Sequence, residues 1–184
     1  MSDEYCLSQL ILFLTEAEGK QILFAGLGNL LRKDDGVGAF ITRNIMKSDH
    51  ITPLTVEVSL ENYIGKINTM NPDNLVFVDC TEMQRNPGFY MLLSPDKIAD
   101  HTFNTHNISL SRLNDFFLMP TFLLAIQPGD TSFGEELTPL VKNKADEIIN
   151  IINQGKYGCQ MSSPDGFSQI GKNGSKMRRL HTSR

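Results

Sequence analysis

The segment "LFAGLGNLLRKDDGVGAF", residues 23–40, decides the fold. Its apolar run is short and enters a pair of glycines, which is typical of a buried strand, and we place that strand at 21–27. Two adjacent aspartates, Asp34 and Asp35, precede a second pair of glycines, and a helix is predicted over 36–47. The segment therefore predicts a strand, a loop and a helix in direct succession.

The same alternation continues along the chain. Further strands are predicted at 53–59, 74–80, 88–94 and 121–127, and further helices at 5–18, 62–70, 107–118 and 138–154. In the last helix, Thr138 is the expected N-cap and Leu140 is counted in the buried face. The strand at 88–94 follows the previous strand too closely for a helical crossover, which favours an antiparallel neighbour. We expect one three-layer α/β domain, with a twisted, mixed, mostly parallel sheet of about five strands covered by helices on both faces.

Length, charge and cysteine usage limit the class of protein. The 184 residues suit one domain, and no window approaches the apolar length of a membrane span, so we expect no membrane insertion. Three cysteines without a CxxC pair indicate free thiols and a cytoplasmic location. We expect an N-terminal helical extension at 1–19, one domain at 20–156 and a basic, disordered tail at 157–184. The tail lacks interleaved aromatic residues, so no nucleic-acid partner is expected, and a monomer is favoured.

The glycines of the opening segment superficially resemble the dinucleotide-binding loop G-x-G-x-x-G. Gly26 and Gly28 fit its first two positions, but Leu31 occupies the third. Asp34 and Asp35 would also place negative charge beside a phosphate, at a site that should be positive. The loop therefore suits a cation better than an anion, unless one aspartate simply caps the helix that follows.

Acids or imidazoles at the ends of other strands would support a site, because open α/β sheets bind ligands beyond the carboxyl ends of their strands. Asp79 ends the apolar run "NLVFVDC", and His106 stands at the start of the helix predicted at 107–118. Taken alone, each also suits a turn or cap residue. Together with the aspartate pair they could form a site for a divalent transition metal, or a paired-carboxylate site in which one acid activates water.

These motifs resemble those of the hydrogenase maturation endopeptidases, which trim the C-terminal extension of a [NiFe] hydrogenase large subunit after nickel insertion. The family motif G-x-G-N-x-L-x-x-D-D-G-x-G matches "GLGNLLRKDDGVG", residues 26–38. It is followed in order by "LVFVDC", "NPGFYMLLSPDKIAD", "THNISL" and "LLAIQPGDTSFGEELTPLV". "THNISL" and "AIQP" are most similar to the branch that serves hydrogenase 3 and related membrane-bound enzymes. The resemblance covers about residues 20–154.

The resemblance implies that Asp35, Asp79 and His106 are the catalytic, nickel-binding residues. The nickel would arrive on cysteine thiolates of the substrate and not be permanently bound, so that only a nickel-loaded precursor is cut. The other motif residues would shape the loop: Gly26, Gly28, Asn29, Asp34, Gly36 and Gly38. Of the two adjacent acids, Asp34 is the one expected to cap the helix.

The implied function is an aspartyl-type endopeptidase whose partner is the precursor of a [NiFe] hydrogenase large subunit. The alternative is a nickel-dependent chaperone or assembly scaffold that holds the same precursor without cutting it. After the second strand the chain has "EVSLENYIG" where many members carry a D-G-G-like turn. Glu61 and Asn62 are retained there and are expected in the loop that faces the substrate.

Overall fold

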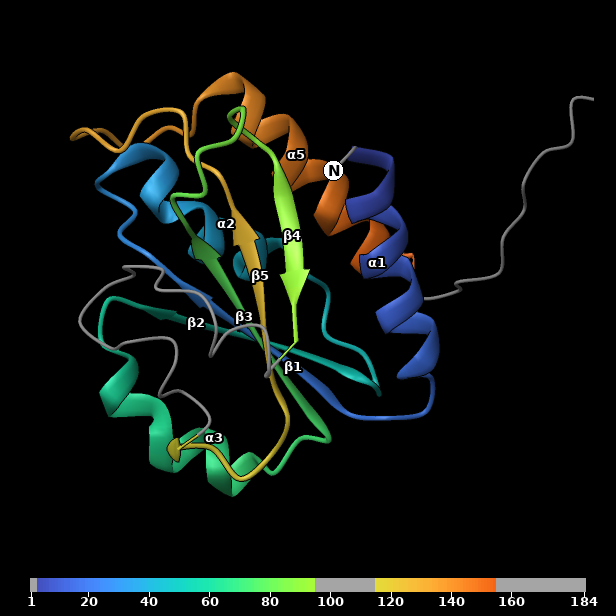
Figure 1. Ribbon diagram of the computed structural model, residues 1–184. Coiled ribbons are helices and arrows are strands. Elements are labelled where there is room, and N and C mark those ends of the chain that lie inside the picture. Colours follow the sequence, from blue (N-terminus) through green and yellow to red (C-terminus); the bar gives the residue numbers. More distant parts are fainter. Residues whose placement is uncertain (1–2, 95–114, 155–184) are drawn as a thin grey trace, which may run out of the picture.

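Five strands form one sheet, in the order β2-β1-β3-β5-β4 (Figure 1). The computed structural model describes residues 3–94 and 115–154, and all five strands lie within them. Their bounds are β1 Ile22–Leu27, β2 Ile51–Glu57, β3 Asn74–Cys80, β4 Tyr90–Leu93 and β5 Thr121–Ile126.

Four strands run in parallel and the fifth runs against them. β1 pairs in parallel with β2 and β3, and β3 pairs in parallel with β5. β4 is antiparallel to β5, so the antiparallel strand predicted at 88–94 is confirmed, although its neighbour is β5 and not the strand that precedes it. The carboxyl ends of β1, β3 and β5 therefore meet at one edge of the sheet.

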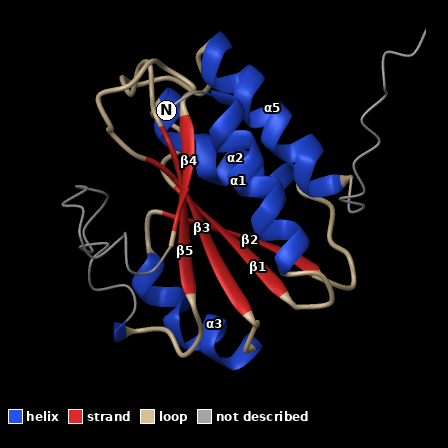
Figure 2. Cartoon of the chain, turned by 45° about the vertical axis from the view of Figure 1, so that its right-hand side comes forward, coloured by secondary structure: helices blue, strands red, loops and turns tan. Residues whose placement is uncertain are grey.

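Helices cover both faces of the sheet. Their bounds are α1 Asp3–Glu16, α2 Val37–Asn44, α3 Ile64–Met70 and α5 Pro139–Asn153, with short 3-10 helices η1 Lys33–Gly36 and η2 Leu60–Tyr63. α1, α2 and α5 lie on one face and α3 on the other (Figures 1 and 2). The predicted three-layer fold class is confirmed. The helix predicted at 107–118 falls largely outside the described residues, and within those residues no helix is long and apolar enough to cross a bilayer.

Each face of the sheet has its own apolar cluster. Phe24 and Val76 pack with α1, α2 and α5, whereas Leu23 and Phe77 pack with α3. Because β3 is buried along its whole length, its sequence is a continuous apolar run and not an alternating one. Asp79 is the exception in that run, since it is a completely buried acid.

Two expectations about element details are wrong. β2 ends at Glu57 and not at residue 59, because Glu57 adopts a left-handed backbone conformation with φ of 61°. Leu140 is largely exposed, since it lies one residue, or about 100° around the helix, from the buried stripe of α5. That stripe consists of Val141, Ala145, Ile148, Ile149 and Ile152.

Candidate functional site

The order of the strands places a topological switch point between β1 and β3. The chain leaves β1 through α2 to reach β2 on one side, then returns through α3 to β3 on the other side. Open α/β sheets bind ligands at such a switch point, beyond the carboxyl ends of the strands. Asp35 lies in η1, in the connection after β1, and Asp79 lies near the carboxyl end of β3. The two acids therefore belong to the two strands on either side of the switch point.

Close backbone approaches explain the glycines of the β1–α2 connection. A Cβ atom on Gly38 would overlap the backbone carbonyl oxygens of Leu27 and Val78, so this glycine lets α2 lie directly on β1 and β3. Gly28 has φ of 112°, and a Cβ there would overlap the carbonyl oxygen of Asp35. The tight loop thereby holds Asp35 against the end of β1.

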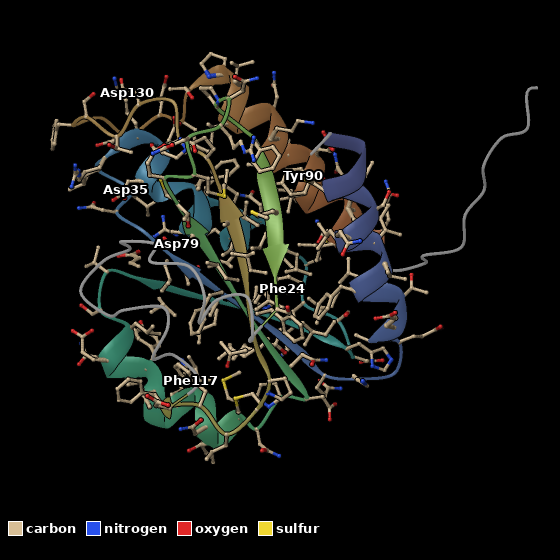
Figure 3. The ribbon with its side chains drawn as sticks, in the orientation of Figure 1. Phe24, Asp35, Asp79, Tyr90, Phe117 and Asp130 are labelled. Carbon is tan, nitrogen blue, oxygen red and sulfur yellow. The ribbon has the colours of Figure 1, made fainter. Side chains whose placement is uncertain are left out.

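Asp35 and Asp79 are buried at the same end of the sheet (Figure 3). Asp79 is 0% exposed and Asp35 is 5% exposed. The backbone N–H of Asn29 donates a hydrogen bond to Asp35 Oδ2 over 3.2 Å, and the Asn29 Oδ1 atom accepts one from the N–H of Leu31 over 2.9 Å. Asn29 thus folds the loop around itself while its backbone orients the carboxylate of Asp35.

The pKa of the Cys80 thiol is raised by the environment at this end of the sheet. Burial raises its pKa above the ordinary range, and the negative charges of Asp79, Asp35 and Asp34 raise it further. The three carboxylates are therefore close enough to act on one sulfur atom. Such a field favours a cation, and carboxylate oxygens are suitable ligands for a divalent transition metal.

The third predicted ligand, His106, lies outside the described residues. Within residues 3–94 and 115–154, no three His, Cys, Asp or Glu side chains are grouped so that they could hold a metal ion. The described part of the structure places Asp35 and Asp79 at the same end of the sheet, and the assignment of these two carboxylates as metal ligands stays a prediction.

Asp34 does not cap the helix that follows it, so that expectation is wrong. Neither η1 nor α2 has a side-chain cap hydrogen bond. The carboxylate of Asp34 is 0% exposed and points to the loop after β5. Its Oδ2 atom accepts from the N–H of Gly129 over 2.8 Å, the N–H of Asp130 over 2.9 Å and the hydroxyl of Thr138 over 2.8 Å. Its Oδ1 atom accepts from the N–H of Thr138 over 2.7 Å.

Thr138 occupies the N-cap position of α5, as expected from the sequence, but its hydroxyl makes no cap bond. Asp34 instead binds the N–H and hydroxyl of this residue from another part of the chain. A carboxylate at this place also complements the positive end of the α5 dipole. Asp34 therefore stabilises the start of a helix about a hundred residues away from it in sequence.

The loop after β5 is the part of the site that the sequence patterns did not predict. Besides Asp34, Lys33 binds this loop through an ion pair with Asp130. Near the loop, the buried amide of Gln127 accepts from the N–H of Met83 over 2.7 Å and donates to Glu82 over 3.0 Å. The available signal was position: "QPGDTSFG" follows the carboxyl end of a parallel strand, where ligands bind.

Glu61 and Asn62, predicted to face the substrate, lie in η2 after β2. Both are exposed. The N–H of Gly28 donates to the carbonyl oxygen of Glu57 over 3.1 Å, which ties the end of β2 to the β1–α2 loop. The chain that leads to Glu61 and Asn62 therefore starts from the same edge of the sheet as Asp35.

Known proteins are similar to this chain in sequence and in fold. A family model described as hydrogenase maturation protease (HycI) matches residues 58–154, more than half of the chain. The hydrogenase 3 maturation protease of Escherichia coli K12 is 28% identical over 128 residues, which cover 66% of this chain and 82% of that protein. The crystal structure of the [NiFe] hydrogenase maturation protease HycI from Thermococcus kodakarensis is similar with a TM-score of 0.68 and 26% identity, covering 78% of this chain and 97% of that one. HybD of Escherichia coli, at 21% identity and a TM-score of 0.58 over 71% of this chain and 88% of that one, has the same fold.

Proposed function

Because this chain belongs to the hydrogenase maturation protease family, we propose that it is an endopeptidase acting on the precursor of a [NiFe] hydrogenase large subunit. It removes the C-terminal extension after nickel has been inserted, as the last step of maturation. One observation supports this proposal most directly: two buried carboxylates, Asp35 and Asp79, lie at the carboxyl ends of β1 and β3, where the strand order has its switch point. Buried acids at this place favour a cationic ligand, and ionisable groups buried at such a position are candidates for a functional site.

The nickel ion belongs to the substrate in this proposal. The precursor would carry it on cysteine thiolates, and Asp35, Asp79 and His106 would complete its coordination when the precursor docks. A divalent ion there polarises a carbonyl or lowers the pKa of a bound water. Coordination by these residues would place the peptide bond next to the nickel at the carboxyl ends of β1 and β3. A carboxylate beside that bond can act as the general base toward water. Only a nickel-loaded precursor would be positioned for cleavage.

Several broader assignments belong to the same proposal. Residues 20–156 would form the catalytic domain, with 1–19 as a helical extension and 157–184 as a tail. We propose a cytoplasmic protein, because three cysteines without a CxxC pair suit a reducing compartment, and we propose that it is a monomer.

Cleavage can be tested with the large-subunit precursor encoded in the same genome, purified with and without nickel. Mass spectrometry should show loss of the C-terminal peptide from the nickel-loaded form alone. Asp35→Asn and Asp79→Asn should abolish the product, whereas Asp49→Asn, an exposed acid before β2, should not change it. A stable complex with no peptide released would instead support the chaperone or scaffold.

The histidine has a control of its own. His106→Ala should abolish cleavage, and His101→Ala should leave it largely unchanged, because only His106 lies in the "THN" motif. Equal loss of activity in the two variants would contradict the assignment of His106.

A further inference from the structure

The buried carboxylate of Asp34 is the centre of a contact between two loops. Its four hydrogen bonds, all between 2.7 and 2.9 Å, reach only Gly129, Asp130 and Thr138. All four donors belong to the connection from β5 to α5, whereas Asp34 belongs to the connection from β1 to α2. Asp34 therefore joins the two loops that follow two parallel strands at the functional edge of the sheet.

Backbone hydrogen bonds continue this contact. The N–H of Lys33 donates to the carbonyl oxygen of Gly134 over 2.7 Å, and the N–H of Gly134 donates to the carbonyl oxygen of Leu31 over 2.9 Å. Arg32 and Gly134 form a parallel bridge, and the Arg32 Nε atom donates to the carbonyl oxygen of Thr131 over 3.2 Å. The two loops thus run together as a short two-stranded unit at the edge of the sheet.

The joined loops place two apolar side chains in solvent. Leu31 and Phe133 each directly precede one residue of the parallel bridge, so the bridge brings their two backbone positions together. Leu31 is half exposed, and Phe133 is 83% exposed. Single exposed apolar residues are common on protein surfaces. Here the bridge brings two of them together on joined loops next to the proposed site, so we consider them candidates for a contact surface.

We propose that Asp34 is a positioning residue for the substrate: it fastens residues 129–138 onto residues 29–35, so that Leu31 and Phe133 together form the contact surface for the precursor. This inference rests on the proposed function, and it names the part of the protein that determines affinity. Leu31 belongs to the same connection from β1 to α2 as Asp35 and lies four residues before it, so this surface is next to the proposed site. Asp34 itself does not touch the precursor.

The physical basis is preorganisation. A loop that is already fixed loses less conformational freedom when a partner binds, so the fastening of 129–138 raises affinity without a new contact. Weakening it reduces the fraction of molecules with Leu31 and Phe133 in place, and the apparent dissociation constant rises by the same factor. The chemical step, which depends on Asp35 and Asp79, is not changed.

Thr138 is the best residue for the test because Val keeps its shape and removes only the hydroxyl bond to Asp34. Thr138→Val should raise the dissociation constant for the nickel-loaded precursor, measured by biolayer interferometry, by about tenfold. The single-turnover cleavage rate at saturation should stay within about twofold. Thr138→Ser keeps the donor and should bind like the wild type. Phe133→Ser should also weaken binding by about tenfold without slowing cleavage at saturation.

Two matched controls lie at the opposite edge of the sheet. Thr121 is a completely buried threonine whose hydroxyl binds the carbonyl oxygen of Met119, so Thr121→Val removes a comparable bond far from the site. Leu118 is 81% exposed, close to the value of Phe133, and Leu118→Ser matches that substitution. Both control variants should keep the wild-type affinity within about twofold, at a temperature where every variant is folded.

Hydrogen exchange gives a readout that needs no substrate. Thr138→Val should accelerate exchange of the amides of Gly129 and Asp130, whereas Thr121→Val should not. A wild type that cleaves the precursor, combined with unchanged affinity in Thr138→Val or equal weakening in Thr121→Val, overturns this inference and leaves the proposed function intact. A wild type that neither binds nor cleaves the nickel-loaded precursor overturns the proposed function and, with it, the assignment of this precursor as the substrate.

Discussion

Replacement of Asp34 by asparagine should be costly to the fold. An asparagine side chain offers one acceptor oxygen and one NH2 group, but the native carboxylate receives three donors on Oδ2 and a fourth on Oδ1. In either orientation of the amide, at least one buried donor faces the NH2 group. The best orientation keeps the Oδ2 position as oxygen and leaves the N–H of Thr138 unsatisfied.

The magnitude follows from these contacts. One lost hydrogen bond to a charged group costs about 1.5–3 kcal/mol, and the unsatisfied N–H adds about 1–3 kcal/mol. The lost charge at the start of α5 adds about 0.3–1 kcal/mol. Removal of a buried charge gives some of this back, and the terms are not additive, so we expect a net loss of about 3 kcal/mol in the free energy of unfolding. For a domain of this size that corresponds to a fall in Tm of about 6–12 °C.

Asp35→Asn is the matched comparison, because it makes the same chemical change at the next residue. An amide oxygen can still accept from the N–H of Asn29, and the neutral side chain removes a negative charge that is costly to bury. Its Tm should stay within about 2 °C of the wild type, or rise, while cleavage is abolished. Thermal and urea unfolding monitored by circular dichroism measure both variants. Equal Tm shifts in the two variants, or no shift in Asp34→Asn, would refute this reasoning.

Three further predictions concern packing, pH and thiol reactivity. Gly38→Ala should destabilise the protein by about 1–3 kcal/mol in urea unfolding, because its Cβ would overlap two strand carbonyl oxygens, whereas Gly65→Ala has open space in α3 and should stabilise by about 0.5–1 kcal/mol. The hydrogen bond from Lys33 lowers the pKa of Asp130 from 3.8 to about 2, so this contact stabilises the fold above pH 4 and is lost as the pH falls toward 2; acid unfolding of Asp130→Asn should lack that component. Burial and nearby carboxylates raise the pKa of Cys80, so iodoacetamide at pH 8 should leave it unmodified in the native protein and label it after unfolding, as read by mass spectrometry.

The family membership and the fold class follow from local sequence patterns, and both are confirmed. The segment from Gly26 to Gly38 is informative because its glycines meet backbone requirements, such as the positive φ at Gly28 and the close approach at Gly38. The placement of Asp35 after β1 and of Asp79 near the carboxyl end of β3 also follows from sequence, since apolar runs mark the strands. The roles of Asp35, Asp79 and His106 in nickel binding stay predictions.

Long-range contacts account for what the sequence patterns missed. Nothing in the residues around Asp34 indicates that its partners are Gly129, Asp130 and Thr138, and local rules favoured a helix cap instead. Leu140 was placed in the core because spacings of three and four tolerate a neighbour about 100° from the buried stripe. The error at Asp34 arises because a local preference for a helix cap competes with a contact that forms only after the sheet has assembled, whereas the error at Leu140 concerns only the width of the buried stripe.

The sequence by itself determined the order of strands and helices and the positions of the acids at the strand ends, because hydrophobic periodicity records which face of each element is buried. Only the tertiary structure decided which groups Asp34 binds. Asp35 lies near the switch point between β1 and β3. Asp34 binds the loop after β5, where its partner Thr138 is 104 residues away in sequence. The physical reason is that a hydrogen bond depends on the position and direction of two groups, and these are fixed only when β1 and β5 are brought into one sheet by β3.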